Sequence, residues 1–337
     1  MEKEKIINIC KNLDSQNPIF ININKDYTNE LISNIEKLKD IKEEKIKTLL
    51  CGNSNYDQFT FNQGVAELLV YFLLNKQGID FSTEKNENDD NESNVDVSTE
   101  VSNLKINIEV KSPAYPIHNP KMLTGSFANR FGNKEDNALM MNDLKDKLNQ
   151  NIEDSNYESV DIQNLTDNKI KDCLLSGQNK FSDPSESCLN VLFLCTTTIE
   201  MQSYWQYIVN SSSGFFNEVS DVSSFFSDKK QTITLKKEMY DKVSCIVLSN
   251  AITLNERKTS EAWDINKAIT LVLVNPFCKY YNKKHYRILD SIFKNNTSDF
   301  CNGLLNFKEK NPGIPELLYF FEFTSKNGYD VNKEQKE

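Results

Sequence analysis

The sequence predicts an α/β fold, in which a mixed central β-sheet is flanked by helices and preceded by a helical N-terminal extension. The first observation is a pair of arms rich in β-branched residues, 94–101 and 104–111, separated by two turn-forming residues. The second is a set of continuous apolar runs at 189–195, 243–249 and 268–275, which are typical of buried strands. The third is the presence of amphipathic or apolar helical segments before and between these strands.

The N-terminal part of the chain carries a long helical pattern. Residues 26–50 are expected to form one amphipathic helix, because apolar residues recur along a single stripe. The stripe consists of Leu31, Ile35, Leu38, Ile41, Ile46 and Leu49. A more apolar helix is expected at 61–78, and the polar run at 81–94 lacks periodicity and predicts a flexible loop. Further helices are expected at 138–152, 165–180, 286–295 and 314–323.

The hairpin at 94–111 places charged residues on one face. If Ser102 and Asn103 form a two-residue loop, Asp96 lies directly opposite Glu109. Facing Cβ atoms are only about 5 Å apart, so two carboxylates there need a positive group between them. Lys111 points to the same face because side chains alternate along a strand. The geometry predicts a pocket with two carboxylates and one ammonium, a donor set that suits Mg²⁺.

Two alternatives remain open for this hairpin. Glu100 lies four residues from Asp96 on the same face, and a bulge would make it the metal-binding acid instead. The hairpin could also be a surface element of mixed charge, with Lys111 exposed. Acid-x-Lys tripeptides are common in this chain, but only Glu109-Val110-Lys111 lies in a β-branched run that ends at a strand-stopping Ser112-Pro113.

Asp96 followed by Glu109-Val110-Lys111 resembles the motif of the PD-(D/E)xK nuclease superfamily, whose members share a restriction-endonuclease-like core. The surrounding order is similar as well: the helix at 61–78 carries Glu67, and a helix at 168–181 leads into the strand at 189–195. Two departures stand out. Val95 takes the place of the usual proline before the aspartate, and a long insertion falls around 115–165.

The resemblance implies metal-dependent hydrolysis of phosphodiester bonds. It implies that Asp96, Glu109 and the carbonyl of Val110 hold Mg²⁺, with Mn²⁺ as a substitute. Lys111 would orient or deprotonate the attacking water, and Glu67 would complete the site through water. The alternative for Glu67 is a glutamate near a helix N-terminus, favoured there by the helix dipole. The implied organisation is a helical extension at 1–58, a nuclease core at 59–275 and a C-terminal helical region at 276–337.

The charge distribution bears on nucleic-acid binding. The net charge of −10 is unfavourable for a DNA enzyme. A basic stretch with interleaved tyrosines at 278–287 is nevertheless a candidate for contact with phosphates and bases. Its candidate residues are Lys279, Lys283, Lys284, Arg287 and Tyr281. The alternative is a solvated helix start whose tyrosines pack on the core.

Composition limits the other possibilities. The two histidines, His118 and His285, exclude mechanisms that need several imidazoles, and neither GxGxxG nor GxxxxGK[ST] occurs. No apolar run approaches the ~20 residues that a membrane span needs, so a cytoplasmic protein with free thiols is expected. The sequence thus predicts a Mg²⁺-dependent DNA endonuclease, acting as a homodimer in restriction or anti-phage defence with a partner or activator. The alternatives are an RNA nuclease of the same fold and a catalytically silent nucleic-acid-binding subunit.

Overall fold

The computed structural model describes residues 1–39, 41–51, 56–86, 94–113, 122–127, 142–143, 145–150, 159–164, 167–209, 215, 222–223, 234–280 and 282–293. The chain divides into two compact units. The first consists of Met1–Pro113, Cys173–Met201 and Tyr240–Glu337, and the second of Ala114–Asp172 and Gln202–Met239. The predicted division at 58 and 275 is not tested by this grouping and stays a prediction.

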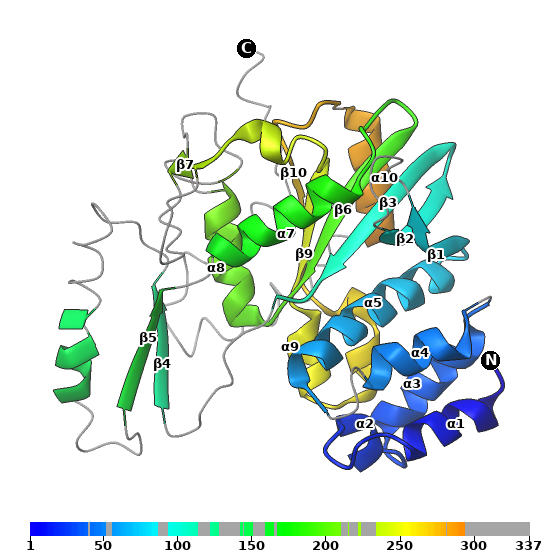
Figure 1. The fold of residues 1–337 in the computed structure, drawn as a ribbon. Helices are drawn as coiled ribbons and strands as arrows, with labels where there is room; N and C mark the ends of the chain where they lie inside the picture. Colours follow the sequence, from blue (N-terminus) through cyan, green and yellow to red (C-terminus); the bar gives the residue numbers. More distant parts are fainter. Residues whose placement is uncertain are drawn as a thin grey trace, which may run out of the picture. The chain divides into compact units, whose positions relative to one another are not determined.

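The first unit contains a six-stranded mixed sheet with the order β1-β2-β3-β6-β9-β10 (Figure 1). The strands are β1 (Phe81–Asn86), β2 (Asn94–Val101), β3 (Leu104–Lys111), β6 (Cys188–Cys195), β9 (Cys245–Ser249) and β10 (Thr270–Val274). The central β3, β6 and β9 are parallel, whereas β1, β2 and β10 are antiparallel to their neighbours. The predicted α/β class with a mixed sheet flanked by helices is therefore confirmed.

The two faces of the sheet differ in chemistry. Val97, Ile108 and Val110 belong to the main hydrophobic core, together with the buried side of α5 (Gln58–Lys76). Glu109 and Lys111 alternate with these residues and therefore point to the opposite face, toward the end of α7 (Asp167–Lys180). The charged residues of the hairpin thus lie on the face away from the main core.

A row of amides crosses this second face. Ser98 Oγ donates to Asn107 Oδ1, and Asn107 Nδ2 donates to Asn190 Oδ1 on β6. Asn190 Nδ2 then donates to the carbonyls of Ser182 and Lys242. Asn107 and Asn190 are fully buried, and these bonds satisfy amides that would otherwise cost about 1–3 kcal/mol each.

Four described helices precede α5 in the chain, and the last two of them pack on it. They are α1 (Lys3–Lys11), α2 (Pro18–Ile21), α3 (Asp26–Lys37) and α4 (Glu43–Cys51). The prediction of one helix over 26–50 is wrong, because the backbone becomes extended at Leu38, with ψ 128°. This break redirects the chain so that α4 lies against α5. A Cβ on Gly64 would lie 1.9 Å from the carbonyl oxygen of Leu49, so only glycine permits this approach.

The prediction of a loop over 81–94 is wrong for its first part. Residues Phe81–Asn86 form β1, an edge strand paired with β2 from Phe81↔Thr99 to Asn86↔Asn94. The strand is polar because one of its long sides faces no other described strand, and its backbone pairing requires no apolar side chains. Residues 87–93 lie outside the described residues.

The predicted register of the β2–β3 hairpin is confirmed. Val101 pairs with Leu104 and Val97 pairs with Ile108, as a two-residue loop requires. Ser102 and Asn103 have φ values of 55° and 63°, the two left-handed conformations of a type I′ turn. This turn matches the twist of the strands, and it brings Asp96 to the level of Glu109.

The remaining elements complete the two units. The first unit also contains α9 (Ala251–Glu256), α10 (Lys283–Phe293) and the short helices η2 (Ser260–Trp263) and η3 (Ile265–Lys267). In the second unit, β4 (Met122–Phe127) pairs in parallel with β5 (Ser159–Asn164), and β7 (Val222–Ser223) pairs with β8 (Thr234–Leu235). Two further elements are α8 (Thr198–Val209) and η1 (Lys237–Met239). His118 and the expected helix at 314–323 lie outside the described residues.

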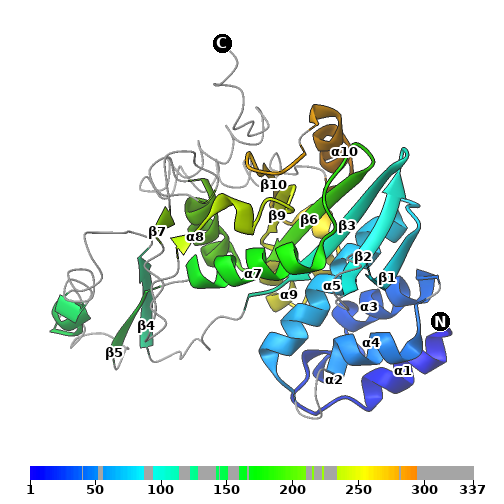
Figure 2. The ribbon, with the colours of Figure 1, turned by 45° about the horizontal axis from the view of Figure 1, so that its top comes forward.

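The helices that surround the sheet are seen from a second direction in Figure 2, where α7 crosses in front of β6 and β9. The expected strands at 189–195, 243–249 and 268–275 are present with small shifts at their ends. Among the described helices, none is both long enough and apolar enough to cross a membrane.

Candidate active site

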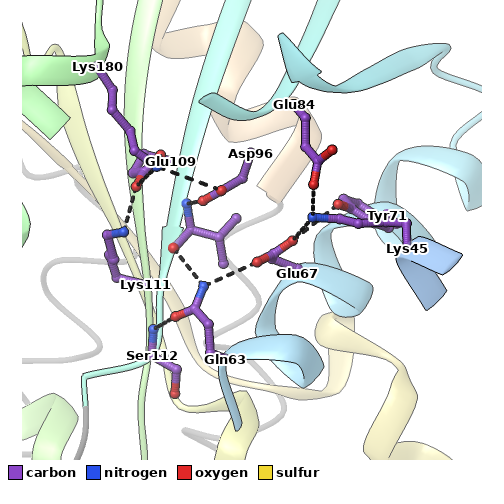
Figure 3. A network of polar contacts seen from close by, with 11 residues as sticks. Lys45, Gln63, Glu67, Tyr71, Glu84, Asp96, Glu109, Lys111, Ser112 and Lys180 are labelled. Atoms are coloured by element: carbon purple, nitrogen blue, oxygen red, sulfur yellow. Dashed lines mark hydrogen bonds and ion pairs between the residues drawn. The ribbon is translucent and has the colours of Figure 1, made fainter. Parts of the chain in front are cut away.

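The backbone of β3 fixes the orientation of Asp96. The N–H of Val110 donates to Asp96 Oδ2 at 2.7 Å, so this oxygen is held against the neighbouring strand. The other oxygen, Oδ1, is directed toward Glu109 and Lys180 (Figure 3). The hairpin therefore presents one oxygen of Asp96 beside the carboxylate of Glu109.

Glu109 is fully buried and contacts two ammonium groups. Lys111 Nζ lies 2.6 Å from Glu109 Oε1. Lys180, in the last turn of α7, lies 2.8 Å from Oε1 and 2.9 Å from Oε2. Lys180 Nζ also approaches Asp96 Oδ1 at 4.0 Å. The two carboxylates and two ammonium groups together are electrically neutral.

The ionisation of Glu109 and Lys111 reflects this crowding. Burial raises the pKa of Glu109, and the negative charge of Asp96 raises it further, while both lysines act in the opposite direction. For Lys111, burial alone would lower the pKa, but the ion pair and hydrogen bond with Glu109, together with the charge of Asp96, raise the pKa overall. Lys111 is therefore positively charged at neutral pH.

Gln63 connects α5 to the end of β3. Its Nε2 donates to the carbonyl of Val110 at 2.9 Å, and its Oε1 accepts from the N–H of Ser112 at 2.8 Å. The side-chain amide thus bonds to the backbone of β3 and Ser112 beyond the last β2–β3 pair, Val97↔Ile108. It fixes the direction of the Val110 carbonyl, one of the predicted metal ligands.

Glu67 lies at the other end of the same network. It is 6% exposed, and its Oε1 accepts a long hydrogen bond of 3.4 Å from Gln63 Nε2. Its Oε2 accepts from Tyr71 at 3.2 Å and pairs with Lys45 Nζ at 3.1 Å. Burial raises the pKa of Glu67, and the charge of Asp96 adds to this effect.

The explanation of Glu67 by a helix dipole is wrong. The helix begins at Gln58, earlier than expected, so Glu67 lies in its middle. The field of a helix terminus falls off within one turn and does not reach this position. Its immediate partners are instead the cation of Lys45 and two hydrogen-bond donors, Gln63 and Tyr71.

The structure also places the other candidate acid. Glu100 is exposed and its Cα faces Lys105 next to the hairpin turn. Asp96 contacts the backbone of Val110, whereas Glu100 lies at the turn end of the strand. Among the described residues, no group of three His, Cys, Asp or Glu side chains is arranged to hold a metal ion. A metal would therefore have to rely on two carboxylates and a backbone carbonyl.

The basic stretch at 278–287 is described only in part. Lys279 pairs with Asp183 at 3.3 Å and with Asp241 at 3.8 Å, so acidic neighbours compete for its charge. Lys284 and Arg287 are exposed on α10. Tyr281 lies outside the described residues, and the side chain of Lys283 does too. A nucleic-acid contact by residues 278–287 therefore stays a prediction.

Four residues of this network were not predicted from the sequence: Lys180, Gln63, Lys45 and Tyr71. Gln63 had a signal, because it lies four residues before Glu67 and so on the same side of the helix. Lys45 and Lys180 had no such signal in the sequence, since only the tertiary fold brings each of them to its partner. Lys180 is 71 positions from Glu109 in the sequence.

The fold and this network together define an α/β protein whose mixed sheet carries two neighbouring carboxylates, the fully buried Glu109 and the partly exposed Asp96, with lysines as their counter-ions. Comparison with family models, with curated proteins and with solved structures finds no match for this chain.

Proposed function

We propose that this chain is a metal-dependent nuclease of the PD-(D/E)xK type with a restriction-endonuclease-like core, and that it hydrolyses phosphodiester bonds of DNA. The observation that carries the proposal is the grouping of Asp96, Glu109 and Lys111. The order of elements supports it as well: α5 with Glu67, the β2–β3 hairpin, then α7 and a parallel β6.

The donor set fits a hard divalent cation. Asp96 Oδ1, the Glu109 carboxylate and the Val110 carbonyl are oxygen ligands of the kind that Mg²⁺ prefers, and Mn²⁺ is the expected substitute. Burial and the charge of Asp96 raise the pKa of Glu109, and a cation bound to these oxygens would favour the ionised carboxylate. When bound, the metal would contribute Lewis-acid stabilisation of the scissile phosphate.

The residues of the chain would perform the remaining tasks. Lys111 is held in its charged form, so its role is to donate hydrogen bonds to the negative charge that develops on the phosphate. This favours charge stabilisation over proton abstraction by Lys111. Gln63 would hold the Val110 carbonyl in its ligand direction, and Glu67, fixed by Lys45 and Tyr71, would position Gln63.

One observation favours a second candidate, a catalytically silent subunit that binds nucleic acid. Because two lysines already neutralise the two carboxylates, the site is electrically balanced without a metal. An RNA nuclease of the same fold would use the same residues, so the polymer must be identified by experiment. We further propose a homodimer, since two sites would allow both strands to be cut, and a role in restriction or anti-phage defence with a partner or activator.

The test is cleavage of supercoiled plasmid, single-stranded DNA and RNA in Mg²⁺, Mn²⁺ or EDTA. Glu109→Gln should reduce cleavage about 100-fold or more, because it removes a ligand charge while keeping the side-chain shape. Glu100→Gln is the matched control and should retain full activity, because Glu100 is exposed although it lies on the same face of β2 as Asp96. Cleavage that persists in EDTA, or in Glu109→Gln, would contradict the proposal; binding without cleavage would favour the silent subunit.

A further inference from the structure

Lys180 occupies the place between the two acids. Its Nζ lies 2.8 and 2.9 Å from the two oxygens of Glu109, and 4.0 Å from Asp96 Oδ1. One ammonium therefore contacts both oxygens of one carboxylate and approaches a second carboxylate (Figure 3). This is the position from which a single cation can bridge Asp96 and Glu109.

The charges make simultaneous occupation unfavourable. Asp96 and Glu109 carry two negative charges, and Lys111 and Lys180 carry two positive charges. A divalent cation bound to the same oxygens would leave an excess of two positive charges in largely buried surroundings, where unpaired charge is costly. A divalent cation held by the two carboxylates would also compete with the Lys180 ammonium for the same oxygens of Glu109.

The Lys180 side chain can leave without movement of its helix. Beside it, Phe181 is fully buried, and Gln178 is fixed by Asp241 at 2.8 Å and by the N–H of Lys242 at 2.8 Å. These contacts anchor the end of α7. The Lys180 side chain itself is 23% exposed, so rotation about its side-chain bonds leads to solvent.

We propose that Lys180 is the resident cation of the acid pair and competes with the divalent metal ion for Asp96 and Glu109. The inference rests on the proposed function only in that it takes this pair as the metal site. Lys180 is a positioning residue: in the metal-free protein its ammonium holds the two carboxylates side by side. With a divalent cation held by Asp96 and Glu109, the Lys180 ammonium would leave the pair and its side chain would turn toward solvent.

The experiment is a calorimetric titration of the full chain with Mg²⁺ or Mn²⁺ in the absence of nucleic acid. Lys180→Met keeps the apolar stem and removes the charge, so the metal should bind about tenfold more tightly than in the wild type. Lys180→Arg keeps the charge and should remain near the wild-type affinity. Lys11→Met, an exposed lysine in the last turn of α1, is the matched control and should leave metal affinity unchanged.

A second measurement, the Tm, tests whether Lys180→Met loses stability when no metal is present. Without its counter-ion, Lys180→Met should have a lower Tm in EDTA and a larger rise in Tm on addition of Mg²⁺ than the wild type. Equal or weaker metal binding by Lys180→Met, no metal binding by either protein, or a variant that stays unfolded at high Mg²⁺ would overturn the proposal. Since these assays contain no nucleic acid, tighter metal binding without cleavage would overturn only the nuclease function.

Discussion

The environment of Lys111 in the structure differs from the one that the sequence predicts. A lysine on a strand face is expected to be exposed, with little effect on stability. Here its ammonium lies 2.6 Å from a fully buried glutamate, and only about a quarter of the side chain is exposed. Any loss of Lys111 therefore affects the fold as well as the chemistry.

Lys111→Met should lower the free energy of unfolding by about 1–3 kcal/mol in metal-free buffer, because Glu109 loses one of two counter-ions. It should also abolish cleavage. Denaturant unfolding with and without Mg²⁺ measures the first effect, and the metal should recover part of the loss. A Tm equal to that of the wild type would show that Lys180 alone is sufficient to balance Glu109.

Lys258 is a second lysine in an unusual environment. Its ammonium lies 5.2 Å from the ring centre of Tyr27 and 5.7 Å from that of Phe61. Burial lowers the pKa of Lys258 to about 8, although Glu256 acts in the opposite direction. Because the folded protein binds this proton less tightly than the unfolded chain, the charged lysine opposes folding at neutral pH.

Lys258→Met should therefore raise the free energy of unfolding at neutral pH by about 1–2 kcal/mol, after allowance for its partial exposure and the lost ring contacts. The advantage over the wild type should shrink as the pH rises from about 8 toward the ordinary lysine value of 10.5, since the wild-type lysine then becomes neutral. Urea unfolding at both ends of this range is the measurement. An advantage independent of pH would indicate a packing effect.

At the scale of elements, the contact between α4 and α5 depends on one glycine. Gly64→Ala would bring a Cβ to 1.9 Å from a backbone oxygen of α4, and neither helix backbone can yield cheaply. The expected loss of stability is about 3 kcal/mol or more. Gly177→Ala is the control, because its nearest neighbour is the side chain of Phe181 at 3.1 Å, which can shift slightly. Equal Tm values for both variants would contradict the close contact.

The β2–β3 turn offers a prediction of opposite sign. Both Ser102 and Asn103 adopt positive φ, which favours an Asn-Gly pair. The double change Ser102→Asn with Asn103→Gly should stabilise the protein by about 0.5–1 kcal/mol, whereas Asn103→Val should destabilise it. Thermal unfolding of the two variants checks this. Stabilisation by Asn103→Val would rule out the type I′ turn.

Elements that depend on local interactions were predicted from the sequence, and elements that depend on tertiary contacts were not. The hairpin was predicted to the residue because its pattern and turn are local. The break between α3 and α4 was missed because Leu38 and Ile41 continue the apolar stripe, and no glycine or proline marks the end. Packing against Gly64 requires the break, and that contact is tertiary. β1 was missed for the same reason, since its pairing with β2 carries no apolar signal.

The same reasoning applies to the site. Asp96, Glu109 and Lys111 were found because a strand period and a hairpin register are enough to bring them together. Lys180 and Lys45 lie on helices that only the tertiary fold brings to the network. Their spacing from the hairpin residues in the sequence therefore could not predict these contacts. Sequence reasoning therefore predicted the chemical groups of the hairpin and missed the counter-ions that make them compatible with burial.

At the scale of the whole molecule, the N-terminal helices are part of the main core. Ile6, Leu31 and Leu49 belong to the same hydrophobic cluster as α5 and one face of the sheet. Lys45 of α4 also holds Glu67 through an ion pair. Deleting residues 1–57 would expose this side of α5.

A chain that begins at residue 58 should therefore fail to fold cooperatively. Circular dichroism and gel filtration of the truncated chain, beside the full chain, are the measurements. A folded truncated chain with a cooperative transition would show that the N-terminal helices are a separable extension.

The row of amides from Ser98 through Asn107 to Asn190 has a consequence for how the sheet assembles. A shift of β3 by one residue against β6 would turn its charged face into the main core, whereas a shift by two residues would keep the apolar face buried. In the observed register Asn107 lies directly opposite Asn190, and both amides have hydrogen-bond partners. A sheet with β3 shifted by two residues would separate Asn107 from Asn190, and buried amides without partners would destabilise this misaligned sheet relative to the native one.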